Sequence, residues 1–296
     1  MRGRVQFLAE EGTGRRRDEL SSVGGLLRGR RFVVLSGAGC STDSGIPDYR
    51  GPTGSLRRRA PVQYQEFLRS EAVRQRYWAR SLLGFGQVGA AQPNAVHRAV
   101  AALERAGLVT GLITQNVDGL HSQAGSQRVV ELHGSLHWVR CLACGRRESR
   151  AALQAQLLAQ NPEYAQHSAV AAPDGDADFE PGTAGLPAFQ VPGCPGCGGL
   201  LKPDVVFFGE NVPRPVVDAA WGFFAEASAL LILGSSLAVY SGFRFARGAA
   251  ERSLPILVIN QGPTRADDLA ALRVEAPLAP SLTALCHQLG VAIEVA

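Results

Sequence analysis

Short apolar runs alternate with amphipathic segments along most of the chain. Each run has the length of one strand, and most are bounded by Gly, Asn or Ser; the runs are Phe32–Leu35, Leu108–Ile113, Val129–Leu132, Ala229–Leu233 and Ile256–Ile259. Continuous apolar runs of this length are typical of parallel strands that are buried on both faces. They predict a parallel sheet with helices on both sides.

Helical periodicity occupies several of the intervals between these runs. In residues 93–107 apolar side chains recur at helical spacing, a proline can occupy the first turn, and a glycine ends the segment. Pro213–Ala227 and Ser241–Ser253 are also predicted to be helical. The alternation of strands and helices predicts an α/β fold built on a Rossmann-like, doubly wound parallel sheet.

Two stretches interrupt the alternation. Residues 51–92 contain a predicted helix, roughly Tyr64–Leu83, and residues 136–203 contain four paired cysteines. Within the second stretch, Asn161–Pro192 is rich in Ala, Pro, Gly and Asp, as expected of a mobile loop. We therefore expect a Rossmann-like domain over 28–135 and 204–296, a helical insertion over about 51–92, and a smaller cysteine-bearing module over 136–203. Residues 1–27 are expected to be a flexible tail.

Length and composition narrow the class of protein. The chain has 296 residues, 46% of them hydrophobic, which suffices for a large core. No apolar run approaches the roughly 18 residues of a membrane span, so no membrane partner is expected. The N-terminus lacks the apolar region of a secretory signal, and its acidic residues argue against a mitochondrial presequence. We expect a cytoplasmic protein, with the mitochondrial matrix as the minor alternative.

The charge pattern does not indicate a nucleic-acid surface. The net charge is +4 and the pI is about 8.9. The two dense basic clusters, Arg15–Arg17 and Arg57–Arg59, are not interleaved with aromatic residues. A nucleic-acid partner is therefore not expected.

Four of the six cysteines form two Cys-x-x-Cys pairs, Cys141 with Cys144 and Cys194 with Cys197. Two such pairs can surround one zinc ion tetrahedrally, and four thiolates leave no coordination position open for catalysis. We predict a structural zinc site. The alternative is a pair of redox dithiols, for which the sequence offers no thioredoxin-like context.

Polar groups follow each predicted strand directly. They are Gly37–Gly39, Thr114–Asp118, His133–Gly134, Gly234–Ser236 and Asn260–Gly262. Because ligands of open parallel sheets bind beyond the carboxyl ends of the strands, we expect these groups to meet in one crevice. Gly37-Ala38-Gly39 is compatible with a pyrophosphate. A dehydrogenase would also need an acidic residue about twenty positions later to bind the adenosine ribose. Pro47 interrupts the segment that would lead to that residue, so the pattern does not favour a dehydrogenase.

The motifs that combine these features resemble the sirtuin family of NAD-dependent protein lysine deacylases, and most closely its class II branch. They are GAGCSTDSGIPDYRG (37–51), TQNVDGLH (114–121), ELHGS (131–135), KPDVVFFGE (202–210), GSSLAVYS (234–241) and VIN (258–260), together with the cysteine pairs. They occur in the family's order and extend over roughly residues 28–290. RQRYWAR (74–80) supports the class II comparison.

The resemblance implies a reaction between an acyl-lysine and NAD. The acyl oxygen attacks C1′ of the nicotinamide ribose, nicotinamide leaves, and the ribose 2′-hydroxyl then attacks the acyl carbon. His133 would be the base for this second attack. Asn116 would orient the ribose, and Asp118 would hold the nicotinamide carboxamide. The products would be free lysine, nicotinamide and O-acyl-ADP-ribose.

The remaining NAD contacts follow from the same resemblance. Asp48, Tyr49 and Arg50 would belong to a flap over the nicotinamide end, and Gln115 would bond a ribose hydroxyl. Asn260 would reach the adenosine ribose, and Leu278 would line the adenine pocket. The other NAD-binding residues expected from the motifs are Gly37, Ala38, Val117, Gly234, Ser235, Ser236, Gln261 and Gly262.

The acyl-lysine substrate is expected to enter as an extended strand that pairs with the backbone of the protein. The residues expected to contact it are Val206, Phe207, Phe208, Gly209, Glu210 and Leu237. Tyr77 and Arg80 are three apart on a predicted helix and so share a face. They resemble the Tyr-x-x-Arg pair of desuccinylating sirtuins, which gives the hypothesis that they admit acidic acyl groups. The alternative is ordinary helix surface.

Three other functions compete with this prediction, and one of them is the dehydrogenase, for which the geometry of the nucleotide loop is wrong. Mono-ADP-ribosyl transfer would use the same NAD site with a different nucleophile. A zinc-bearing nucleic-acid module would leave the polar groups at the strand ends without a role.

Cys40 could be an activated thiol near a helix start, although packing is the expected role of a small apolar side chain.

Overall fold

The computed structural model describes residues 18–50, 61–180, 182 and 185–293. Part of the predicted tail (1–17) and the start of the predicted helical insertion (51–60, with Arg57–Arg59) lie outside these residues. Among the helices that are described, none is long and apolar enough to cross a membrane.

The larger sheet has six parallel strands in the order β3-β2-β1-β7-β8-β9. The strands are β1 (Phe32–Ser36), β2 (Val109–Thr114), β3 (Val129–Glu131), β7 (Ala229–Leu233), β8 (Ile256–Ile259) and β9 (Leu272–Val274). The strand order reverses between β1 and β7, as in Rossmann-like folds. The five predicted strands are confirmed. The edge strand β9 is additional, because three residues around Arg273 give no continuous apolar run.

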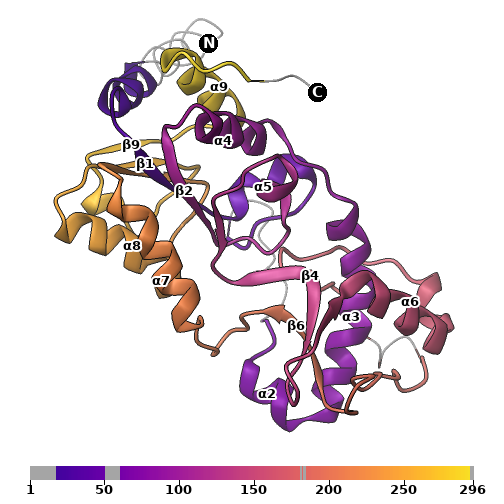
Figure 1. The fold of residues 1–296 in the computed structure, drawn as a ribbon. Coiled ribbons are helices and arrows are strands. Elements are labelled where there is room, and N and C mark those ends of the chain that lie inside the picture. The colour runs from indigo at the N-terminus through magenta and orange to yellow at the C-terminus, as the bar shows by residue number, and fades with distance from the viewer. Residues whose placement is uncertain (1–17, 51–60, 181, 183–184, 294–296) are drawn as a thin grey trace, which may run out of the picture.

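Helices cover both faces of this sheet (Figure 1). Phe32 and Val34 of β1 belong to a core with α4 (Ala95–Arg105) and α9 (Leu278–Gln288). Val33 and Leu35 belong to a second core with α7 (Arg214–Gly222) and α8 (Tyr240–Glu251). Every residue of β1 is buried. The continuous apolar run therefore reflects burial on both faces, as predicted.

The described part of the expected flexible tail is ordered and packs on the core. Residues 18–27 form a helix, and its Val23 and Leu27 are completely buried in the core that contains α9. These two side chains lie four residues apart and so face the same side of the helix. That short apolar stripe was the available signal, and the arginine-rich sequence before it obscured it.

The smaller sheet is antiparallel, with the order β5-β4-β6. Its strands are β4 (Gly134–Cys141), β5 (Arg147–Ser149) and β6 (Leu201–Val205). The helices beside it are α2 (Tyr64–Arg69), α3 (Glu71–Ala90) and α6 (Arg150–Gln160). The single helix predicted over Tyr64–Leu83 is thus two helices, separated at Ser70, whose hydroxyl caps α3 by accepting the Val73 N–H at 3.3 Å.

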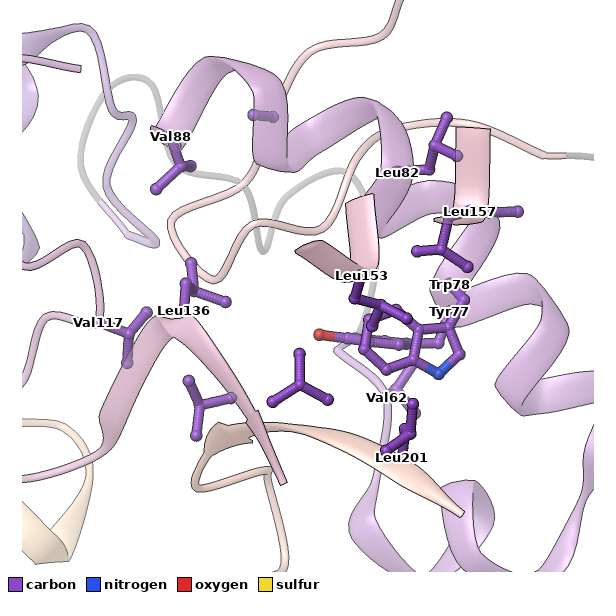
Figure 2. Packing of buried hydrophobic residues seen from close by; sticks show 14 of the residues in the cluster. Val62, Tyr77, Trp78, Leu82, Val88, Val117, Leu136, Leu153, Leu157 and Leu201 are labelled. Carbon is purple, nitrogen blue, oxygen red and sulfur yellow. The ribbon is translucent and has the colours of Figure 1, made fainter. Parts of the chain in front are cut away.

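The helical insertion and the cysteine-bearing module form one unit. Trp78 and Leu82 of α3 share a buried core with Leu153 and Leu157 of α6 and with Leu201 of β6. Figure 2 shows these side chains together with the ring of Tyr77. The two insertions were predicted separately because nothing local in either sequence specifies the other as its partner.

The described part of Asn161–Pro192, predicted as a mobile loop, is attached to this unit. Tyr164 and Phe189 are buried, and their rings meet edge to face at 4.9 Å. Ala171 and Ala177 form an antiparallel bridge. The Ala, Pro, Gly and Asp composition correctly indicates irregular structure, but a few apolar residues bind the segment to the core.

Candidate active site

A cavity of about 1030 Å³ lies at the carboxyl ends of the strands, between the large sheet and the smaller unit. Of the residues predicted to contact NAD or substrate, Arg80 alone is absent from its lining. The predicted residues that do line it are Gly37, Ala38, Asp48, Tyr49, Arg50, Tyr77, Gln115, Asn116, Val117, Asp118, His133, Val206, Phe207, Phe208, Gly209, Glu210, Gly234, Ser235, Ser236, Leu237, Asn260, Gln261, Gly262 and Leu278. The polar groups that follow the strands therefore meet, as their positions predict.

Two loops approach each other closely where the strand order reverses. A Cβ on Gly37 would lie 2.6 Å from Ser235 Cβ, and one on Gly39 would lie 2.9 Å from Gly234 Cα. The Gln115 amide, which follows β2, connects the two by donating to the Ser36 carbonyl at 3.2 Å and to Ser235 Oγ at 2.8 Å. The result is a narrow backbone cradle at the position where Rossmann-like folds bind a pyrophosphate.

His133 lies between the two sheets, after β3 and before β4. Its Nδ1 is 2.9 Å from the Gln115 carbonyl oxygen. A carbonyl can only accept, so in the neutral ring Nδ1 carries the proton and Nε2 holds a lone pair. Nε2 accepts from Ser241 Oγ at 2.8 Å. Burial lowers the pKa of His133, and the hydrogen bond to Gln115 opposes that shift only in part. A neutral imidazole with its lone pair at the cavity is suited to accept a proton.

Ser41, Asn116 and Asp118 form a buried polar network at the lining of the cavity. Ser41 Oγ donates to Asp118 Oδ2 at 2.7 Å and accepts from Asn116 Nδ2 at 3.0 Å. Asp118 Oδ1 accepts the N–H of Leu120 at 2.9 Å, at the start of α5 (Leu120–Gln123). Burial raises the pKa of Asp118, and these hydrogen bonds counteract it. The network fixes the orientation of both side chains.

Two buried histidines, which do not line the cavity, lie next to this network. His97 Nε2 is 3.4 Å from Ser41 Oγ, and its Nδ1 accepts the N–H of Asn94 in the capping box of α4. The ring of His121 lies 4.6 Å from that of His97. Burial lowers the pKa of His97 to about 4 and that of His121 well below its usual value. Both rings are therefore neutral at physiological pH.

The segment after β6 connects to His133 through the backbone. The N–H of Val206 donates to the His133 carbonyl at 2.8 Å. Glu210 accepts the N–H of Phe207 at 2.9 Å and pairs with buried Lys202 at 3.0 Å. Across the cavity mouth, Leu237 has a φ of 51°, a left-handed conformation unusual for a leucine. These contacts give both edges of the predicted substrate groove a defined shape.

The flap residues line the cavity from the other side. Tyr49 is half-buried and its ring is 6.3 Å from that of Phe208, edge to face. Arg50 is exposed. Leu278 lies at the start of α9, lines the cavity and is 8% exposed.

The Tyr77 and Arg80 side chains have different surroundings. Tyr77 lines the cavity and is 4% exposed. Arg80 is 5% exposed and forms an ion pair with buried Asp176. Neither residue is ordinary helix surface, but the Arg80 charge already has a partner within the protein.

The four paired cysteines come together at one end of the small sheet. Their sulfur atoms all lie within 4.8 Å of one another. Gly145 and Gly198, which follow the second cysteine of each pair, have φ values of 73° and 72°. A Cβ on Gly199 would lie 3.1 Å from Cys141 Sγ. Four converging thiol groups are the donor set of a closed structural metal site.

Some residues of the site were not predicted from the sequence. Ser41, His97 and Ser241 contact the predicted polar residues, and Asp174 and Asp176 line the cavity from the 171–177 loop. Ser41 and Ser241 stand within or at the end of the quoted motifs, which was the available signal. The loop aspartates offered none, because acidic residues are ordinary in a surface loop.

The thiol of Cys40 is not activated. It is completely buried, and burial raises its pKa to about 12. Its packing in the core of the large sheet agrees with the expected structural role.

Taken together, the strand order, the glycine cradle at its reversal and the cysteine-bearing second unit define an α/β protein that binds a dinucleotide between two units. A family model described as the Sir2 family matches residues 37–241. The chain belongs to the Sir2 family.

Several relatives are similar over most of their length. The NAD-dependent protein deacetylase of Xanthomonas campestris pv. campestris is 54% identical over 258 residues, which cover 87% of this chain and 87% of the relative. NAD-dependent protein deacetylase 1 of Streptomyces coelicolor is 52% identical over 275 residues, which cover 93% of this chain and 91% of the relative.

Solved Sir2 structures share the fold. One contains a deacetylated p53 peptide and 3′-O-acetyl ADP ribose; it matches with a TM-score of 0.73 and 28% identity, over 92% of this chain and 98% of that chain. Another contains a p53 peptide and NAD+; it matches with a TM-score of 0.71 and 29% identity, over 90% of this chain and 96% of that chain.

Proposed function

We propose that this Sir2-family protein is an NAD-dependent protein-lysine deacetylase that transfers the acyl group to ADP-ribose and releases nicotinamide. The observation that carries the proposal is the neutral His133 ring, with Nδ1–H on the Gln115 carbonyl and Nε2 at the cavity. The names of the relatives and the peptide and NAD complexes of the similar structures support it.

The proposed reaction uses the two ends of the cavity differently. The cradle around Gly37 and Gly234 would hold the pyrophosphate of the NAD co-substrate. Asp118 and Asn116, fixed by Ser41, would orient the nicotinamide and its ribose. Fixing these groups in advance favours the geometry in which the acyl oxygen displaces nicotinamide.

His133 would act in the following step. Its Nε2 would accept the proton of the ribose 2′-hydroxyl as that oxygen attacks the acyl carbon. Ser241 Oγ would first have to give up its hydrogen bond to Nε2. The imidazole needs no prior deprotonation at neutral pH, because burial lowers its pKa.

The peptide part of the substrate would lie between the backbone of residues 206–210 and that near Leu237. The partners would be acyl-lysine side chains on other proteins. The four cysteines would hold one zinc ion with a structural role, since the donor set is complete without water. The bacterial origin of the relatives favours the cytoplasm over a mitochondrial matrix.

Nicotinamide release from NAD with an acetyl-lysine peptide tests the proposal. We expect release that depends on the acetyl group, together with a deacetylated peptide and O-acetyl-ADP-ribose by mass spectrometry. His133→Ala should reduce the rate by about 10²–10⁴-fold. His287→Ala, an exposed histidine on α9 outside the cavity, is the matched control.

The products also separate the competing activity. An ADP-ribosylated protein with the acetyl-lysine unchanged would instead indicate mono-ADP-ribosyl transfer. A peptide-dependent release that His133→Ala leaves intact would contradict the proposed role of His133.

A further inference from the structure

The part of the cavity near Tyr77 is lined by a loop of the smaller unit as well as by α3. Pro173, Asp174 and Asp176 of this loop line the cavity together with Tyr77. We propose that this part of the cavity is an acyl channel, which receives the acyl chain of the substrate, and that Asp176 is its selectivity residue: by holding Arg80 in an internal ion pair, Asp176 makes the channel accept uncharged acyl groups and reject those that end in a carboxylate. This inference rests on the proposed deacylase function.

The ion pair is buried and supported on both sides. The Arg80 and Asp176 side chains are 5% and 6% exposed. Arg80 Nε also donates to the Ala177 carbonyl at 3.0 Å, and Asp176 Oδ1 accepts the Ala177 N–H at 2.8 Å. The guanidinium is therefore satisfied by the protein, and an entering carboxylate would have to displace Asp176 to reach it.

The loop that carries Asp176 is held directly on α3. A Cβ on Gly84 would lie 2.5 Å from the carbonyl oxygens of Gly175 and Asp176. The N–H of Ala171 donates to Gln87 Oε1 at 3.2 Å. Because Gly84 permits this close approach one turn after Arg80, the loop and the helix present the ion pair in a fixed position.

The charges at this end of the cavity are unfavourable for another anion. Asp174 also lines the cavity, and its Oδ1 accepts the Asp176 N–H at 3.3 Å. Two carboxylates thus stand beside one paired guanidinium. Burial, and then the charge of Asp174, raise the pKa of Asp176, while the charge of Arg80 lowers it. A third carboxylate would meet the same burial and the same like charges.

Arg150, a second described cation near Tyr77, does not compensate these carboxylates. Arg150 is 1% exposed. Its guanidinium donates to the Ser81 carbonyl and to Gln154 Oε1, and it lies 4.3 Å from the centre of the Phe85 ring. It is directed to α3 and α6, and it is not among the residues that line the cavity.

Tyr77 remains available to an uncharged acyl group. Its hydroxyl makes no hydrogen bond of ordinary geometry to the described residues, and its ring packs among apolar side chains (Figure 2). The ring lines the cavity and can contact an uncharged acyl chain.

Peptides of one sequence bearing butyryl-lysine or succinyl-lysine test the inference, because these acyl groups have the same chain length and differ in the terminal carboxylate. For each, kcat/KM is measured by nicotinamide release. We expect the wild type to favour butyryl-lysine by at least about tenfold. Asp176→Asn should raise the succinyl-to-butyryl ratio by about 10- to 100-fold, since it leaves Arg80 for the substrate carboxylate.

Two further variants isolate the cause. Asp178→Asn removes the same charge from an exposed position of the same segment and should leave the ratio unchanged. The double variant Arg80→Gln with Asp176→Asn should lose the gain, because the gain requires the guanidinium. If Asp176→Asn does not fold, Asp174→Asn replaces it; it breaks no ion pair of the described residues, and a ratio raised by about threefold or more is expected.

Three results would overturn the inference. They are a wild type that prefers succinyl-lysine, an Asp176→Asn ratio no higher than that of Asp178→Asn, and a gain that persists in the double variant. Failure of the proposed function is distinguishable, because then no acyl peptide would cause nicotinamide release. Release with an unchanged ratio would contradict the selectivity alone.

Discussion

Two histidines near the cavity differ in chemical role because their hydrogen-bond partners differ. His133 and His97 are both histidines near the cavity, yet their hydrogen bonds differ. His133 places Nδ1 on the Gln115 carbonyl and leaves Nε2 to a serine hydroxyl at the cavity. His97 uses Nδ1 to cap a helix and is part of the support for Ser41. The first is placed to accept a proton from a substrate, and the second is placed to hold other residues.

The pH dependence of activity should follow His133. Burial lowers its pKa below the ordinary histidine value of about 6.5. The neutral, proton-accepting form therefore persists to lower pH than for an exposed histidine. We expect kcat/KM for deacetylation to be constant near neutral pH and to fall on acidification with a midpoint below about 6.5. A pH profile of nicotinamide release measures this, and a midpoint above that value would contradict the buried environment.

At the scale of the elements, a few polar contacts fix the position of site residues relative to the strand that precedes them. β6 ends at Val205, and the five residues after it form one edge of the predicted substrate groove. Lys202 of β6 is 5% exposed and donates to Glu210 and to the Val205 carbonyl. Glu210 in turn accepts the Phe207 N–H. This pair closes the segment into a fixed turn.

Breaking that pair should weaken peptide binding more than NAD binding. Lys202→Met removes the cation and leaves the Glu210 carboxylate without its partner. We expect the KM for the peptide to rise by about tenfold or more, with a smaller change in the KM for NAD. Glu210→Gln keeps an oxygen that can accept the Phe207 N–H, so its effect should be smaller.

Steady-state kinetics with each substrate varied in turn measures both constants. Arg214→Met is the matched control, because Arg214 pairs with Asp218 at the exposed surface of α7, where such pairs contribute little. Equal increases in both constants for Lys202→Met would contradict a role confined to the peptide groove.

At the scale of the whole molecule, the cavity exists because two units meet. The large sheet provides the glycine cradle, and the smaller unit provides Tyr77 and the 171–177 loop. The smaller unit joins α2, α3 and α6 to the antiparallel sheet in one core. The four cysteines come together at one end of that sheet, and Cys141 and Cys194 belong to the same core.

Removal of the metal should therefore affect the two ends of the cavity unequally. Cys194→Ser or a strong chelator should lower the melting temperature by at least about 5 °C and abolish peptide turnover. NAD binding should be reduced less, because the cradle belongs to the large sheet. Thermal unfolding, NAD binding by calorimetry and metal analysis measure these effects.

One zinc ion per chain is expected in the untreated protein. Cys286→Ser, which changes a cysteine packed beneath α4 and outside the cluster, is the control for the substitution itself. A protein without bound metal whose stability is unchanged by Cys194→Ser would contradict the structural role.

Much of the fold and of the candidate site could be predicted from local patterns. The apolar run Ala229–Leu233 is the strand observed, because burial on both faces requires an apolar residue at every position. The polar groups after each strand meet because parallel strands end at one edge. The division of residues 64–83 into two helices was missed, since Ser70 caps α3 only once Val73 has taken a helical conformation.

The sequence by itself determined the parallel sheet, the convergence of the polar loops and the paired cysteines. Each of these depends on residues that are near one another in the chain or on a rule about parallel strands. Only the tertiary structure decided the tautomer of His133, the shared core of the two insertions and the partner of Arg80. Arg80 and Asp176 lie 96 positions apart, and no periodicity or motif relates residues at that separation. Their pairing follows from how the smaller unit packs, and that packing leaves Asp176 at the cavity lining and Arg80 behind it.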